Sequence, residues 1–180
     1  MEDYISCVKD LLADKNVQRL KEFSHHKGTS RFQHSLNVSY YNYKLCRFLH
    51  LNAKAGARAG LLHDLFFYDW RGHEPVEGEG WHGVGHPKVA FFTASELFPI
   101  TQLEGDMIAT HMWPLSPGLP RYRESYVITL VDKFCAVAEV LSHFFHVSAE
   151  ALLRFCRKSR TRFDMAHAAA LLLVVRMLHR

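Results

Sequence analysis

An adjacent His63-Asp64 pair follows an apolar run, residues 53–62, in which almost no side chain can pair with an imidazole or a carboxylate. Burying such groups without partners is costly, and a divalent metal ion is one of the few partners that satisfies both. His34 and Asp132 occupy comparable apolar surroundings elsewhere in the chain. Imidazole and carboxylate ligands suit Fe, Mn, Co, Ni, Zn or Mg, so the pattern predicts a metal site without selecting its metal.

The elements that must position these side chains are helices, because helical periodicity runs along nearly the whole chain and no alternating strand is convincing. The predicted helices cover residues 3–13, 15–24, 31–49, 52–64, 87–97, 101–111, 124–145, 148–157 and 162–178. Pro87 suits the first position of its helix, and Thr101 with Glu104 suits a capping box. Thr29 or Ser30 is a plausible N-cap for the helix that carries His34.

The predicted architecture is an all-α bundle that forms one domain over residues 1–180. Core motifs occupy about residues 30–145, and we expect the C-terminal helices, residues 148–178, to pack on that core. A long glycine-rich stretch, residues 66–85, has no helical period and predicts a loop beside the metal site. Helices of a bundle can each supply one ligand to a central point, so this architecture suits a shared metal centre.

The order of these residues resembles the HD-domain metal-dependent phosphohydrolases. The resemblance rests on the motifs Arg31-x-x-His34, Leu61-Leu62-His63-Asp64 and Val131-Asp132-Lys133, and it covers about residues 30–145. It implies an HD-type helical fold in which one metal ion is held by His34, His63, Asp64 and Asp132.

Two further histidines match HD proteins that hold two metals. His86 and His111 lie between the His-Asp pair and Asp132, and the resemblance implies that both bind a second ion while Asp64 bridges the two. Two simpler explanations stay open: His86 as a helix N-cap, and His111 as a helix-end residue favoured by the helix dipole. His82 is a rival to His86, because both lie near the same predicted helix start.

Arg31 and Lys133 are candidate substrate contacts and count with Asp64 as predicted catalytic residues. Arg31 lies one helical turn before His34, and Lys133 adjoins Asp132. The resemblance implies that both contact substrate phosphate, which suits a guanidinium fork and an ammonium group. Alternatively, Arg31 is a surface residue at a helix start, and Lys133 pairs with Glu139 or Glu104.

The predicted activity is that of a metal-dependent phosphohydrolase, a phosphomonoesterase or phosphodiesterase. A water activated by one or two divalent ions would attack a nucleotide or another small phosphoester. Two alternatives remain open. One is an HD-type di-iron oxygenase, which uses the same ligand order, and the other is a non-catalytic nucleotide-binding module.

Composition sets outer bounds on the partners. A formal charge of +4 without a long Lys/Arg block suits a small phosphorylated ligand and gives no reason to expect long nucleic acid. The chain begins without a signal-peptide pattern, and residues 165–178 are too short and too interrupted for a membrane span, so we expect a cytoplasmic protein without a membrane partner. The oligomeric state stays open.

Overall fold

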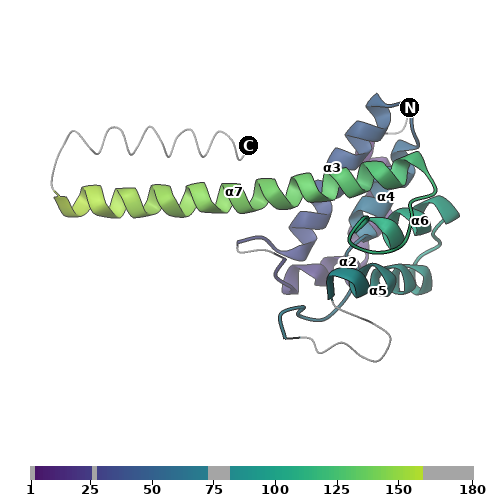
Figure 1. Ribbon diagram of the computed structural model, residues 1–180, viewed down its shortest axis with the longest axis horizontal. Helices are drawn as coiled ribbons and strands as arrows, with labels where there is room; N and C mark the ends of the chain where they lie inside the picture. The colour runs from purple at the N-terminus through teal and green to yellow at the C-terminus, as the bar shows by residue number, and fades with distance from the viewer. Residues whose placement is uncertain (1–2, 26–27, 73–81, 160–180) are drawn as a thin grey trace. The chain divides into compact units, whose positions relative to one another are not determined.

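The computed structural model describes residues 3–25, 28–72 and 82–159, without the side chains of residues 82, 145–146 and 148–159. Within these ranges the chain is all-α, with seven α-helices, one short 3-10 helix and no strand beyond an isolated bridge between Ser24 and Ser30 (Figure 1). The predicted fold class is therefore confirmed at this level.

The helices follow the predicted order closely. They are α1 (Tyr4–Ala13), α2 (Lys15–Arg19), the 3-10 helix η1 (Leu20–Glu22), α3 (Arg31–Phe48), α4 (Ala53–Leu62), α5 (His82–Leu97), α6 (Gln102–Thr110) and α7 (Arg123–Ser159). Side-chain caps fix several starts: Ser30 accepts from the amide of Gln33 at α3, and Asn52 accepts from the amide of Ala55 at α4. Thr101 forms the predicted capping box with Glu104 at α6.

Two predicted boundaries are wrong. α5 begins at His82, so Pro87 lies inside the helix and not at its first position. Proline there removes only one hydrogen bond, near the helix start, and the helix continues through it. α7 runs unbroken to Ser159 where a break after residue 145 was predicted, because the intervening His146-Val147 contains no glycine or proline to end a helix.

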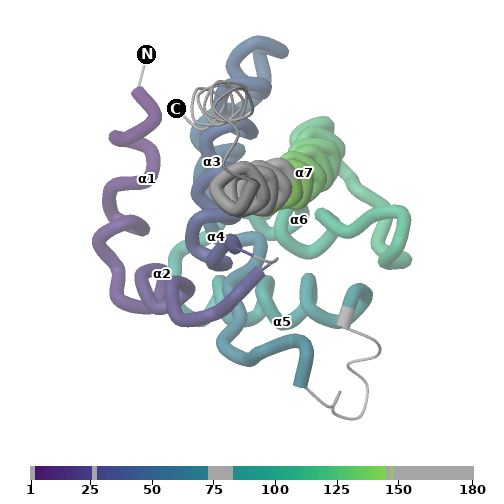
Figure 2. Tube along the Cα trace, turned by 90° about the vertical axis from the view of Figure 1, so that its left-hand side faces the viewer, coloured from purple at the N-terminus to yellow at the C-terminus, as the bar shows by residue number. Residues whose placement is uncertain are grey.

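Close packing of α3 against α4 sets the position of the His63-Asp64 pair. The two helices lie side by side in Figure 2, with α1 against one flank of α4 and α6 against another. A Cβ at Gly60 would lie 2.6 Å from the Cα of Ser39, so only glycine allows this approach. Ser39 completes the contact by donating its hydroxyl to the carbonyl of Ala57 at 2.6 Å.

The apolar core gathers side chains from α1, α2, η1, α3, α4, α5, α6 and the first turns of α7. Its fully buried members include Leu11, Val38, Leu61, Met107 and Ile128. The metal-ligand candidates lie on helices that this core holds together, so the core fixes their backbone positions.

The chain divides into two compact units, Met1–Ala136 and Val137–Arg180. All candidate site residues belong to the first unit. The predicted helix at residues 162–178 lies outside the described residues, so the single domain and the packing of residues 148–178 on the core stay predictions. In the part of the chain that is described, no helix has the length and apolarity needed to cross a membrane.

Candidate metal centre

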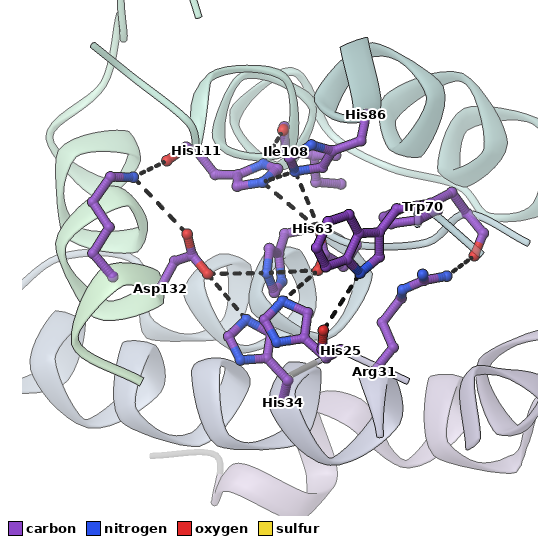
Figure 3. Close-up of polar contacts among 12 residues, drawn as sticks. His25, Arg31, His34, His63, Trp70, His86, Ile108, His111 and Asp132 are labelled. Atoms are coloured by element: carbon purple, nitrogen blue, oxygen red, sulfur yellow. Dashed lines mark hydrogen bonds and ion pairs between the residues drawn. The ribbon is translucent and has the colours of Figure 1, made fainter. Parts of the chain in front are cut away.

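The six predicted metal ligands come from five helices or helix ends and meet in one place (Figure 3). They are His34 on α3, His63 and Asp64 at the end of α4, His86 on α5, His111 at the end of α6, and Asp132 on α7. Each is buried, with no more than 8% of its surface exposed. Such a cluster of imidazoles and carboxylates inside an apolar core is the arrangement that a metal ion stabilises.

One half of the cluster is built around Asp132. Its Oδ1 atom lies 3.0 Å from Nε2 of His34 and 3.5 Å from Nε2 of His63. With metal–ligand bonds of about 2.1 Å, two ligands of one ion lie about 3 to 4.2 Å apart. These three side chains therefore have the separations of ligands that share an ion.

Asp64 connects this half to the second one. Its Oδ1 atom lies 3.5 Å from Nε2 of His86 and 3.8 Å from Nε2 of His111. Its other oxygen, Oδ2, lies 3.8 Å from Nε2 of His63. The two carboxylate oxygens thus face different groups of imidazoles, which is the orientation a bridging carboxylate requires.

His86 and His111 face each other directly, with 2.9 Å between their Nε2 atoms. His86 lies inside α5, so the alternative that it is an N-cap is wrong. His111 does end α6, as its simpler explanation supposes, yet its ring also joins the cluster. The side chain of His82, the rival to His86, lies outside the described side chains.

A hydrogen bond to a helix-end carbonyl orients each of two rings, those of His63 and His111. His63 and His111 each follow the last residue of a helix, and each Nδ1–H donates at 2.8 Å to the carbonyl three residues earlier, that of Gly60 or Ile108. Carbonyls of a last helical turn lack intrahelical partners, so a histidine there satisfies one of them. The proton on Nδ1 leaves the Nε2 lone pair of a neutral ring directed into the cluster.

Electrostatics keep the carboxylates ionised. Burial alone would raise the pKa of Asp64, but His63, His86 and His25 hold that pKa well below its usual range. Burial also opposes ionisation of Asp132, but the hydrogen bond with His34 and the nearby ring of His63 lower its pKa well below the usual value.

The pKa values of His63 and His111 shift in opposite directions. Burial, reinforced by His63 and His86, lowers the pKa of His111 to about 3, so its ring is neutral near pH 7. Burial also acts to lower the pKa of His63, but Asp64 and Asp132 outweigh it and raise that pKa. Bound cations would further stabilise the ionised form of these carboxylates.

Two buried atoms at the centre of the cluster support the fit to a metal. Nε2 of His63 and Oδ1 of Asp64 have no hydrogen-bond partner. A buried polar atom without a partner carries a desolvation cost that native structures rarely leave unmet. Both atoms are lone-pair donors aimed at the other ligands, so a divalent ion is the partner that the donor set fits.

Arg31 is placed differently from its predicted role. The side chain is fully buried and donates from Nη1 to the carbonyl of Phe66 at 2.6 Å and from Nη2 to that of Tyr68 at 3.1 Å. Its guanidinium also stacks 3.5 Å from the centre of the Phe66 ring. It is not the surface residue of the simpler explanation: it clamps the segment after Asp64, and phosphate contact stays a prediction.

Replacing Arg31 with alanine is expected to lower the free energy of unfolding by about 2–4 kcal/mol, because two carbonyls lose a charged donor and the stacked Phe66 ring loses its cover. Urea unfolding of the metal-free protein measures this change in the free energy of unfolding. The exposed Arg123 is the matched control, and its alanine variant should change stability by no more than about 0.5 kcal/mol. Wild-type stability in Arg31→Ala would contradict the clamp.

Lys133 lies beside the cluster, with its side chain 40% exposed and Nζ 3.9 Å from Oδ2 of Asp132. Nζ donates to the carbonyl of His111 at 3.1 Å. Glu104, one alternative partner, instead pairs with Arg58 at 3.2 Å. Burial lowers the pKa of Lys133, and Asp132 opposes the shift. Its contact with phosphate stays a prediction, made from a position that solvent reaches.

His25 is the residue that sequence reasoning missed. No motif in the sequence includes His25, yet its Nε2 atom lies 3.5 Å from Oδ2 of Asp64 and its ring stacks on that of His34. The one available signal was the short turn that joins His25 to the start of α3, which must keep the two segments close. That signal does not choose between His25 and the adjacent His26.

No protein-family model, curated protein or solved structure matches this chain.

Proposed function

We propose that this protein is an HD-type metal-dependent phosphohydrolase that acts on a nucleotide or another small phosphoester. The observation that supports it is the meeting of all six predicted ligands in one buried cluster, with Asp64 directing its two oxygens to different imidazoles. The sequence order of these ligands is the order that the HD resemblance implies.

Divalent ions in such a cluster would lower the pKa of a bound water and neutralise charge on a phosphoryl group. The chain's own contribution is to hold the ligands rigidly. His63 and His111 are oriented by helix-end carbonyls, and Asp64 follows α4 at the point where Gly60 fixes the approach of α3. Preorganised ligands of this kind need no reorganisation when substrate arrives.

Lys133 supplies the proposed positive charge for a substrate phosphate. Its ammonium group is partly exposed and lies next to a ligand carboxylate, so an anion that approaches the ions would meet it. The mild positive net charge of +4 further favours an anionic small molecule. The base or alcohol attached to the phosphate is not selected by these residues.

The test is metal analysis of freshly purified protein, followed by a panel of nucleoside monophosphates, cyclic dinucleotides and simple phosphomonoesters assayed with each metal. We expect bound metal and metal-dependent release of phosphate or nucleotide from one class. Lys133→Ala should raise KM for that substrate, whereas Lys88→Ala, which removes an exposed lysine of α5, should not. Metal binding without turnover on any phosphoester would contradict the hydrolase.

A further inference from the structure

We propose that His25 is a further ligand of this metal centre, on the Oδ2 side of Asp64. The inference deepens the proposed function and rests on it, since it concerns the same ions. His25, His34 and Asp64 each present a ligand atom, and these three atoms all lie within 4.8 Å of one another. They form a second group of metal-ligand geometry beside the group made by His34, His63 and Asp132.

The surroundings of Asp64 carry the argument. On its Oδ1 side two imidazole nitrogens lie at 3.5 and 3.8 Å, those of His86 and His111. On its Oδ2 side two more lie at 3.5 and 3.8 Å, those of His25 and His63. Such separations are long for a hydrogen bond and ordinary for two ligands of one ion. His25 therefore lies at the same distance from Oδ2 of Asp64 as His86 lies from Oδ1, 3.5 Å.

The ring of His25 is held in an orientation that suits ligation. It stacks on His34 with 3.7 Å between ring centres and 15° between planes. Figure 3 shows the rings of His25 and His34 side by side, with a nitrogen of His34 turned toward Asp132, and Nε2 of His25 lies 3.5 Å from Oδ2 of Asp64. This close, nearly parallel stack keeps the ligand atoms of His25 and His34 in the same region beside Asp64, where one ion could bind both.

Hydrogen bonds anchor the backbone of His25 at both its amide and its carbonyl. Its amide donates to the carbonyl of Thr29 at 2.9 Å. Its carbonyl accepts from the indole of Trp70 at 3.4 Å and from Arg71 at 3.2 Å. Trp70 and Arg71 belong to the segment that follows Asp64, so their side chains hold the backbone of His25 against that segment.

The experiment uses the full chain loaded with Co²⁺. Every coordinated imidazole keeps one N–H, which gives an exchangeable, paramagnetically shifted proton resonance. His25→Phe keeps a ring to stack on His34 but has no nitrogen, and His25→Ala removes both. His143→Ala, on α7 and outside the cluster, is the matched control. Affinity for Co²⁺ is measured in parallel by competition with a chelator.

We expect both His25 variants to lose one shifted resonance and to bind at least one Co²⁺ more than tenfold more weakly, with His143→Ala like the wild type. Unchanged resonances and affinity in His25→Phe would overturn the proposal and leave His25 as a packing residue. Loss of the resonance in His25→Ala alone would likewise overturn it, because the stack and not the nitrogen would then matter. A wild type that takes up no Co²⁺ would overturn the proposed function itself, a separate and recognisable result.

Discussion

Asp64→Ala is expected to remove both metal binding and turnover. The carboxylate faces imidazoles on each of its oxygens, so its loss takes a ligand from every ion in the centre at once. We expect metal content to fall close to zero and kcat/KM on the identified phosphoester to fall by more than about a thousandfold, or about 4 kcal/mol of transition-state stabilisation.

A readout independent of activity comes from thermal unfolding with and without metal. Saturating metal stabilises a protein that binds it only when folded, by about 2.7 kcal/mol at one hundred times the Kd. The wild type should therefore show a higher Tm with metal, and Asp64→Ala should show no change. Asp69→Ala removes an exposed carboxylate from the following segment and should behave as the wild type. Stoichiometric metal in Asp64→Ala would refute the bridging role.

The helices and most of the ligand set could be predicted from the sequence because both follow local rules. Caps such as Ser30, Asn52 and Thr101 mark helix starts within a few residues. A polar residue in an apolar helical run, such as His34 or Asp132, must find a partner inside the core. These are properties of short segments, and tertiary structure did not override them.

The features that the sequence did not reveal share a different cause. The role of Arg31 depends on where the carbonyls of Phe66 and Tyr68 lie, more than thirty residues away along the chain. The place of His25 depends on how a turn folds back onto α3, and no periodicity encodes that path. Proline favours a first helical turn and so predicts a helix start at Pro87, yet α5 begins earlier and tolerates the proline inside it. Backbone geometry decided each case.

A second metal ion would be held by His86, His111 and Asp64. The Nε2 atoms of His86 and His111 lie 2.9 Å apart and 3.5 and 3.8 Å from Oδ1 of Asp64, whereas those of His34 and His63 lie 3.0 and 3.5 Å from Oδ1 of Asp132. Replacing His86 or His111 with alanine should therefore lower bound metal from about two equivalents to about one. Turnover should fall about a hundredfold or more, because one ion cannot clamp both the attacking and the leaving oxygens.

Metal counting by elemental analysis, with circular dichroism to confirm the helices and His143→Ala as control, separates the possibilities. His34→Ala should weaken the other ion instead, so the two kinds of variant should differ in which metal site survives. Two redox-inert ions with phosphate release would support hydrolysis, and two irons with oxygen consumption would support the oxygenase. One equivalent in the saturated wild type, unchanged in His86→Ala and His111→Ala, would leave a mononuclear centre and make the contact of these two rings a feature of helix packing.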